Sequence, residues 1–281
     1  MIDLHIHTHT SDGSMTPVEL VNHAKQSGLE AIAITDHDGI ASVKAALDEG
    51  ARIGLEVVPG IELSAQSETE LHIVGLYIDI ENAALNQALE YILTERHERN
   101  LAYVAKLAEL GIPVTLEEAR AEAGPGLLAR AHFAKAMVAK GYVSSVKEAF
   151  DTWLGSGRPA YSSQKQAISA KEAIDIIKNA GGVAVAAHLH LMRKEDSVLY
   201  EYLRELKSYG LDAIEGWYTD YTPEMETTYR KMASDLGLGL SGGTDFHGAM
   251  KPHIAIGRGM GNLDIPYSVL EDIRRIRDSR S

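Results

Sequence analysis

Short apolar runs recur along the chain and alternate with longer segments whose apolar residues follow helical spacing. Runs of roughly four to eight residues rich in Val, Ile and Ala are typical of buried strands. We expect strands over residues 2–7, 31–35, 57–63, 71–78, 183–188, 213–217 and 239–243. Alternation of such strands with helices predicts an α/β protein built on a parallel sheet or barrel.

Two helices are marked by their first residues. Thr16-Pro17-Val18-Glu19 combines an N-cap, a proline at the first helical position and a capping-box glutamate, so it predicts a helix that runs to about Ser27. Pro223 begins another helix, which Gly237 is expected to end. Both helices follow predicted strands, as β/α units require.

The alternation stops between Ala83 and about Ser163. This stretch has the pattern of consecutive helices separated by Gly-rich breaks. We expect a small helical insertion over residues 96–163 and a barrel formed by residues 1–95 and 164–281. Long insertions in such folds usually emerge at the rim that carries the active site, so we expect this one to cap the substrate.

Composition narrows the class of protein. A chain of 281 residues that is 45% hydrophobic can bury a large core, so disorder is not expected. The net charge of -13 and the lack of a basic run argue against binding of long duplex nucleic acid. No apolar stretch approaches the ~20 residues that span a bilayer. We therefore expect a cytoplasmic protein without a membrane partner, and the sequence indicates no oligomeric state.

Histidines and carboxylates stand at the ends of predicted strands or in the loops that follow. His5 and His7 are two residues apart, so both imidazoles point to the same face. The others are Asp12, His37, Glu62, His72, His188, Asp245 and His247. A barrel would collect them at one rim. Because the chain has no cysteine, metal ions there would bind nitrogen and oxygen, which suits zinc, manganese or iron.

Several motifs resemble those of the PHP (polymerase and histidinol phosphatase) family. They are His5-Ile6-His7-Thr8-His9-Thr10-Ser11-Asp12-Gly13, Thr35-Asp36-His37, Gly60-Ile61-Glu62 and Asp245-Phe246-His247. The resemblance implies a distorted (β/α)7 barrel, the PHP fold, with a centre of three divalent metal ions. It implies one ion on His5, His7, Glu62 and Asp245, a second on Glu62, His72 and His188, and a third on Asp12, His37 and His247.

Two segments of the insertion resemble the branch of the family that contains nucleoside 3',5'-bisphosphate phosphatases and short-oligoribonucleotide exonucleases. Residues 129–134 resemble its Arg-x-His-Phe-Ala segment, and residues 155–161 its Gly-x-Gly-(Lys/Arg)-Pro-x-Tyr loop. The resemblance implies that Arg130, His132 and Arg158 lie near a substrate phosphate, which suits the arginine fork. An alternative is that Arg130 and His132 only cap or brace helices of the insertion.

The chain also departs from this branch. Leu189-His190-Leu191-Met192-Arg193 follows His188 where the branch usually has Pro and then Arg, and residues 217–221 lack a histidine that the branch often carries. The substrate can therefore differ from the bisphosphate, and a cyclic ribose phosphate such as 5-phosphoribosyl 1,2-cyclic phosphate is a rival. His190, two residues after His188, is a further candidate for substrate binding.

The predicted function is hydrolysis of phosphate esters in a small phosphorylated substrate, a nucleoside 3',5'-bisphosphate or a short oligoribonucleotide. Glu62 and Asp245 are predicted to be catalytic, because carboxylates can hold two ions together and a hydroxide bridging the ions can attack phosphorus. Arg130 would neutralise phosphate oxygens and His132 would protonate the leaving alkoxide. Alternatives from other classes are an amidohydrolase and a non-catalytic metal-binding accessory domain.

Overall fold

The computed structural model describes residues 1–124, 126–155, 157–161 and 168–280. Contacts divide the chain into two units. We call Met1–Leu89 with Ile168–Ser281 the barrel unit and Glu90–Ala167 the helical unit. The predicted end of the insertion at residue 163 lies outside the described residues.

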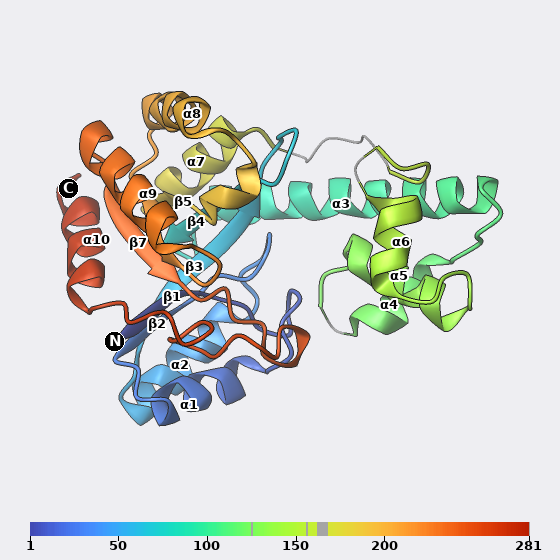
Figure 1. The fold of residues 1–281 in the computed structure, drawn as a ribbon. Helices are drawn as coiled ribbons and strands as arrows, with labels where there is room; N and C mark the ends of the chain where they lie inside the picture. Colours follow the sequence, from blue (N-terminus) through green and yellow to red (C-terminus); the bar gives the residue numbers. More distant parts are fainter. Residues whose placement is uncertain (125, 156, 162–167, 281) are drawn as a thin grey trace. The chain divides into compact units, whose positions relative to one another are not determined.

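The barrel unit contains a sheet whose seven strands, counted over the described residues, follow one another in space in chain order (Figure 1). They are β1 Ile2–Ile6, β2 Ala31–Ile34, β3 Glu56–Ser64, β4 His72–Leu76, β5 Val183–Ala186, β6 Ala213–Tyr218 and β7 Gly239–Gly243. Each overlaps a strand predicted from the apolar pattern. After β7, the Asp245 amide donates to the His5 carbonyl over 2.8 Å and the His7 amide to the Phe246 carbonyl over 2.9 Å. These bonds form a seam between β7 and β1 that nearly closes the barrel.

One strand breaks the parallel pattern that the sequence predicted. β4 runs antiparallel to both β3 and β5, whereas the other neighbouring pairs are parallel. The segment between Ser64 and His72 is too short for a parallel connection, which needs about a dozen residues or more. Ser64 pairs with His72, so the start of β4 lies at the same rim as the end of β3.

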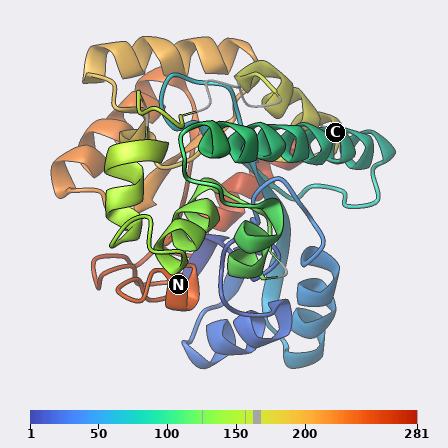
Figure 2. The ribbon, with the colours of Figure 1, turned by 90° about the vertical axis from the view of Figure 1, so that its right-hand side faces the viewer.

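Helices cover the sheet, and the two whose starts the sequence predicted begin at Pro17 and Pro223 as expected. In the barrel unit they are α1 Pro17–Gln26, α2 Val43–Ile53, α7 Ala170–Asn179, α8 Asp196–Ser208, α9 Pro223–Leu236, α10 Ser268–Asp278 and the first residues of α3 Ala83–Glu109. α1 begins with the expected capping box of Thr16 and Glu19, and α9 ends at Gly237 with a φ of 61°. α1 and α2 lie side by side (Figures 1 and 2).

Both faces of the strands are buried, as expected for β/α units. Within β2, Ala31 and Ala33 belong to a core that includes residues of α10, and Ile32 and Ile34 to a second core with α1 and α2. This alternation holds β2 between two apolar layers and fixes its register. Among the described residues, no helix is both long and apolar enough to cross a membrane.

The helical unit has an apolar core of its own. Most of α3 belongs to it, with α4 Leu116–Ala123, α5 Arg130–Ala139, α6 Val146–Ala149 and the π-helix η1 Phe150–Leu154. Phe133 of α5 is fully buried and its ring stacks on Tyr103 of α3 with centroids 5.8 Å apart. Leu107 and Met137 belong to the same cluster. These contacts hold the helices of the unit together.

Candidate metal centre

The residues predicted to bind metal all lie in the barrel unit and at one rim of it. They come from β1 and its loop (His5, His7, Asp12), from after β2 (His37), from β3 and β4 (Glu62, His72), from after β5 (His188) and from after β7 (Asp245, His247). Each of them has a side-chain nitrogen or oxygen within 3.2 Å of another member. The structure therefore brings together all nine side chains named from the sequence.

Glu62 stands in the middle of this group, and its two oxygens face different sets of histidines. Oε2 lies 3.2 Å from Nε2 of both His5 and His7. Oε1 lies 2.8 Å from Nδ1 of His72 and 2.9 Å from Nε2 of His188. This two-sided arrangement suits a carboxylate that bridges two cations.

A second carboxylate, Asp12, forms a neighbouring group. Its Oδ1 lies 3.2 Å from Nε2 of His247, and its Oδ2 lies 3.7 Å from Nε2 of His37. The other ring nitrogen of His37 is 3.0 Å from Glu62 Oε2. His37 therefore stands between the Asp12 group and the Glu62 group, with one nitrogen toward each. The potential metal-binding groups are contiguous rather than separate.

Several atoms of the centre are buried without a hydrogen-bond partner among the described residues: Nε2 of His5 and His7, Nδ1 of His37, Oδ1 of Asp12 and Oε2 of Glu62. Buried polar atoms are almost always hydrogen-bonded, so this concentration needs an explanation. Nitrogen and oxygen atoms pointing into a common space are what a transition-metal ion binds. The residues fit divalent metal ions.

The charges of the centre favour bound cations. Burial opposes ionisation of Glu62, but the histidines around it, first His37 and then His5, hold its pKa well below the usual value. Burial likewise opposes a charge on His7, yet the carboxylates of Asp245 and Glu62, 3.1 Å and 3.2 Å from its Nε2, raise the pKa of its imidazole to about 10. A site that stabilises protonated imidazole also attracts metal ions, and the two compete for the same nitrogen atoms.

Sequence reasoning missed several residues that support the centre. Glu215 of β6 accepts a hydrogen bond from His5. Its presence as an acidic residue within the apolar run of β6 is a signal that could have pointed to this contact. Asp36, noticed only as part of a motif, accepts from the Thr8 amide over 2.7 Å and from the Ser11 hydroxyl over 2.6 Å. Asp36 therefore fixes the loop that carries Asp12.

A lysine that the sequence did not single out reaches the centre from the loop after β7. Lys251 Nζ donates to Asp245 Oδ2 over 2.7 Å, and the Tyr218 hydroxyl donates to the same oxygen over 2.8 Å. The other carboxylate oxygen of Asp245 lies 3.1 Å from His7 Nε2. The Lys251 side chain is 36% exposed, so its ammonium group borders both the ligand cluster and solvent.

His190 has a different setting from the one expected. β5 ends at Ala186, so His190 does not alternate with His188 along a strand; it lies in the 3₁₀ helix η2 Leu189–Met192. Its ring packs near Tyr218 and Tyr221, with centroids 5.4 Å and 5.5 Å away. Tyr218 touches Asp245, so His190 is one side chain removed from the ligand cluster. Its role in substrate binding stays a prediction.

The candidates in the helical unit serve different local roles. His132 is buried, and its Nδ1 accepts from the Ala129 amide over 3.0 Å, which caps the start of α5. Arg130 is exposed, and its guanidinium lies over the Tyr161 ring, 5.5 Å from the centroid. Arg158 is exposed as well. The alternative that His132 braces its helix is therefore observed, and the phosphate contacts of these residues stay predictions.

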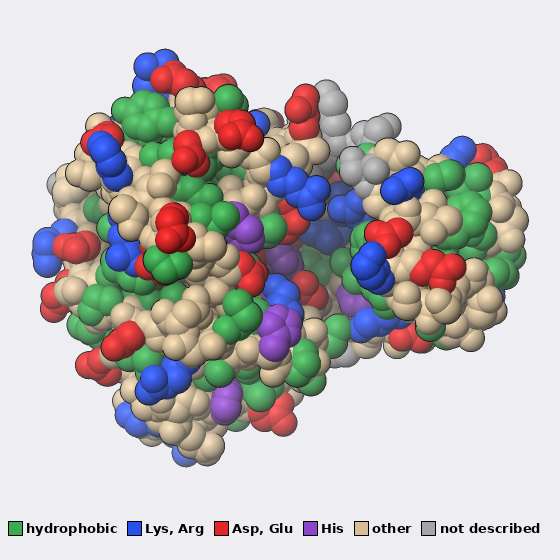
Figure 3. Space-filling view, in the orientation of Figure 1, with side chains coloured by type: hydrophobic (Ala, Val, Ile, Leu, Met, Phe, Trp, Pro, Cys, Tyr) green, Lys and Arg blue, Asp and Glu red, His purple; other side chains and the backbone are tan. Residues whose placement is uncertain are grey.

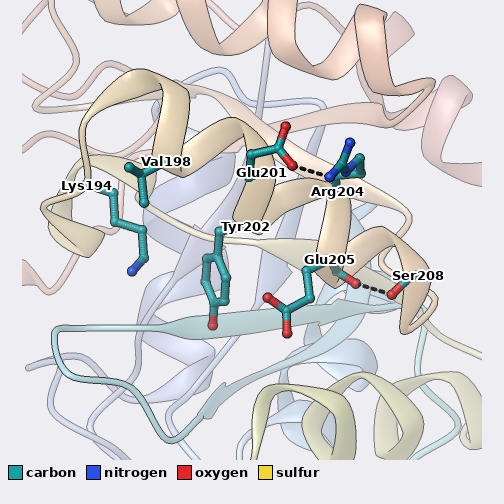
Figure 4. A pocket seen from close by; sticks show the side chains of 7 residues that line it. All are labelled: Lys194, Val198, Glu201, Tyr202, Arg204, Glu205 and Ser208. Carbon is teal, nitrogen blue, oxygen red and sulfur yellow. Dashed lines mark hydrogen bonds and ion pairs between the residues drawn. The ribbon is translucent and has the colours of Figure 1, made fainter.

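The centre opens to solvent at one side. Asp12 is 31% exposed, His37 20% and His72 13%, whereas the other members are nearly buried. Figure 3 shows histidine side chains at the surface of the barrel unit, with acidic and basic side chains near them. A cavity of 520 Å³ lies elsewhere, along α8, where Tyr202 and Glu205 line it (Figure 4). It contains none of the predicted ligands.

Known proteins resemble this chain over most of its length. It is 35% identical to the 5'-3' exoribonuclease Rnm of Escherichia coli over 91% of this chain and 88% of that protein. It is 33% identical to a 3',5'-nucleoside bisphosphate phosphatase of Chromobacterium violaceum, over 88% of this chain and 87% of that protein. It is 32% identical to a phosphoribosyl 1,2-cyclic phosphate 1,2-diphosphodiesterase of Eggerthella lenta, over 90% of this chain and 97% of that protein.

A solved structure extends this similarity to the fold. A Chromobacterium violaceum protein described as an amidohydrolase, solved with bound sulfate and no metal, superimposes with a TM-score of 0.83 at 30% identity over 98% of this chain and 96% of that one. The family model that matches residues 3–207 is that of the PHP domain. Its match takes in the clustered side chains described above from His5 to His188. The chain belongs to the PHP domain family.

Proposed function

We propose that this PHP-family protein is a metal-dependent phosphoesterase that hydrolyses a phosphate ester in a small phosphorylated ribose compound, first of all a nucleoside 3',5'-bisphosphate or a short oligoribonucleotide. The observation that carries the proposal is the two-sided carboxylate of Glu62, with histidines facing each oxygen. Its relatives are named as hydrolases of phosphate esters. We also propose three ions, of manganese, iron or zinc.

The residues of the centre would hold the ions and prepare the site for an anion. Divalent ions supply Lewis acidity and make water a nucleophile at neutral pH. His5, His7 and Asp245 would hold one ion with Glu62 Oε2, and His72 and His188 a second with Oε1, as the resemblance implied. The pairing of Glu62 with both sets would fix the spacing between the ions. Asp12 would hold the third ion on the side open to solvent.

Basic residues in both units support an anionic substrate. Lys251 is partly exposed beside Asp245, where its ammonium group would attract a phosphate once metal ions neutralise the carboxylates. Arg130 and Arg158 are exposed, and we propose that they contact a second phosphate, as in the branch that residues 129–134 and 155–161 resemble. The related Chromobacterium violaceum structure was solved with bound sulfate, which is a tetrahedral anion.

A cyclic ribose phosphate is the second candidate substrate. The Eggerthella lenta relative that is named for this activity matches the chain at 32% identity, and residues 189–193 depart from the bisphosphate branch. Against hydrolysis of an amide stand the basic side chains, which would have less purpose beside a neutral carbonyl. An accessory role is disfavoured because all nine predicted ligands are in place.

The proposal is tested with purified protein reconstituted with manganese, by separating the products formed from each substrate by chromatography and identifying them by mass spectrometry. The substrates are adenosine 3',5'-bisphosphate, a 5'-phosphorylated trinucleotide, 5-phosphoribosyl 1,2-cyclic phosphate and, as the rival class, an N-acyl amino acid. We expect turnover of one or more phosphorylated ribose compounds and none of the amide. Turnover of the amide alone would overturn the proposal. The Glu62→Gln protein serves as the inactive control, so that a contaminating phosphatase is recognised.

A further inference from the structure

Glu215 is a carboxylate that no ligand prediction uses, although it touches two of the predicted ligands. It lies in the middle of β6, and its side chain is 2% exposed. Oε1 lies 2.7 Å from Nδ1 of His5. Oε2 accepts from the backbone amide of His188 over 2.5 Å. Both oxygens of one buried carboxylate are therefore occupied by donors from two different strand ends.

The contact with His5 determines which nitrogen of that ring faces the centre. A carboxylate can only accept, so Nδ1 of His5 must carry the proton that it donates to Glu215. In the neutral ring, the form that binds metal, Nε2 then carries the lone pair, and this atom lies 3.2 Å from Glu62 and 3.6 Å from Asp245. Partners of this kind orient metal-binding histidines and raise their basicity.

The contact with His188 acts on the backbone instead. His188 has a φ of 28° and a ψ of 60°, a left-handed conformation that costs energy in a residue with a side chain. The hydrogen bond from its amide to Glu215 holds this conformation in place. It also sets the direction in which the imidazole leaves the chain, with Nε2 2.9 Å from Oε1 of Glu62.

We propose that Glu215 is a positioning residue that couples the two ligand sets on either side of Glu62. It holds His5, which faces Oε2 of Glu62, and His188, which faces Oε1. A single side chain thereby sets the position of one imidazole on each side of the bridging carboxylate. The inference rests on the proposed function in that it requires metal ions at this centre.

The chemistry of the two contacts makes Glu215→Gln a sharp test. An amide has one accepting oxygen and one donating nitrogen, whereas both partners of Glu215 are donors. If the oxygen of the glutamine side chain accepts from His5, the side-chain NH₂ group faces the backbone N–H of His188, and two donors oppose each other. If the glutamine side chain is flipped instead, its NH₂ group donates to Nδ1 of His5. The proton of His5 must then move to Nε2, which can no longer bind metal. Glu215→Gln keeps size and shape, so a purely space-filling role would leave metal binding unchanged.

Asp212 offers a matched control. It too lies beside β6, and it accepts from the backbone amide of Ala184 in β5 over 2.8 Å, but its other side-chain partners are Lys178 and Arg280 rather than predicted ligands. Like Glu215→Gln, Asp212→Asn replaces one oxygen of a carboxylate that accepts from a backbone amide near β5. It does so without touching His5 or His188.

Manganese binding to chelator-treated protein is measured by calorimetry, and metal content by mass spectrometry. We expect Glu215→Gln to weaken binding about 10- to 100-fold, as for other partners of metal-binding histidines, and Asp212→Asn to bind like the wild type. Wild-type affinity and stoichiometry in a folded Glu215→Gln protein would overturn the inference. If the wild type itself binds no metal, it is the proposed function that fails.

A second measurement does not require the Glu215→Gln protein, because it is made on the wild type. ¹⁵N-labelled histidine in zinc-loaded wild-type protein reports which ring nitrogen of each histidine bears a proton, and a His5→Gln spectrum assigns the His5 signal. We expect His5 to bear its proton on Nδ1 and to bind zinc through Nε2. Zinc on Nδ1 of His5 would overturn the assignment of Glu215.

Discussion

The barrel unit and the helical unit differ in where they keep the side chains that the sequence marks for chemistry. In the barrel unit these side chains are mostly buried and lie in contact with one another, as around Glu62 and Asp245. In the helical unit the buried interior is mainly apolar, Arg130 is exposed, and the buried His132 caps its own helix. The comparison separates side chains that are buried against one another at a barrel rim from side chains that cap a helix or lie exposed on its surface.

The physical origin of the difference is the geometry of the elements. Strand ends of a barrel converge on one rim, so a residue placed there is directed at its counterparts from other strands. In a packed helix, by contrast, only the apolar side chains along one face lie against the core, and the polar side chains of the other face point to solvent. A metal centre needs the first arrangement, whereas contact with ligands of varied shape can use the second.

The largest expected effect comes from the middle of the barrel unit. Glu62→Gln should lower kcat/KM on the natural substrate by roughly 10³-fold or more, because loss of the bridging carboxylate removes Lewis acidity worth several kcal/mol. Metal content, measured by mass spectrometry, should fall with it. Glu201→Gln, an exposed change on α8, is the control and should alter neither quantity. Full activity of Glu62→Gln with fewer ions bound would contradict the proposed role of the centre.

A substitution at Arg130 of the helical unit should lower activity without changing the metal content. Arg130→Ala is expected to lose about 2 to 4 kcal/mol of transition-state stabilisation, as for removal of a single electrostatic donor. Its metal content should stay at the wild-type value. Steady-state kinetics on the bisphosphate measure the effect, with the exposed Arg204→Ala as control. If Arg130→Ala keeps wild-type kcat/KM, the phosphate contact predicted for this residue is wrong.

Lys251 tests whether substrate selection is confined to the helical unit. Lys251→Met keeps the length of the side chain and removes its charge, and we expect kcat/KM to fall about 10-fold, a modest loss because the ammonium group is partly exposed. The loss should appear mainly in KM. Lys171→Met, on the exposed face of α7, should leave kcat/KM unchanged. A loss confined to kcat, or none, would show that Lys251 only balances the charge of Asp245.

The smallest expected effect separates the two roles of His132. His132→Ala should lower the free energy of unfolding by about 0.5 to 2 kcal/mol, since the cap on α5 is lost, and urea denaturation measures this. His132→Gln keeps an acceptor suited to a capping box and should restore most of that stability. If His132 also protonates the leaving group, both variants should lose more turnover, relative to the wild type, on alkyl esters than on nitrophenyl esters. An equal loss on the two ester classes, or none, would show that His132 only caps α5.

Much of the fold could be predicted, because each strand is a short apolar run bounded by turn residues or by a residue of the centre. The start of α1 follows from Thr16 and Glu19, and the end of α9 from Gly237. The direction of β4 was missed, although the short segment between Ser64 and His72 already excludes a parallel connection. Periodicity locates a strand but does not state its direction.

The candidate site could be predicted as a set of residues but not as a network. Motifs identified Glu62, but only the folded chain shows that its two oxygens face different histidines. Glu215 and Lys251 belong to no motif, and their contacts span 210 and 6 residues of sequence respectively. Which nitrogen of an imidazole faces a metal depends on such partners, so it follows from packing rather than from sequence pattern.

The seam between β7 and β1 has a consequence for motion and folding. The amides of His7 and Asp245 bond across segments some 240 residues apart in the chain. Closing so long a loop is entropically costly, so the seam should form late in folding and open before the rest of the sheet. Ions bound to His5, His7 and Asp245 would tie its two sides together. Removing them should speed hydrogen exchange at these amides while the amides between β1 and β2 stay protected.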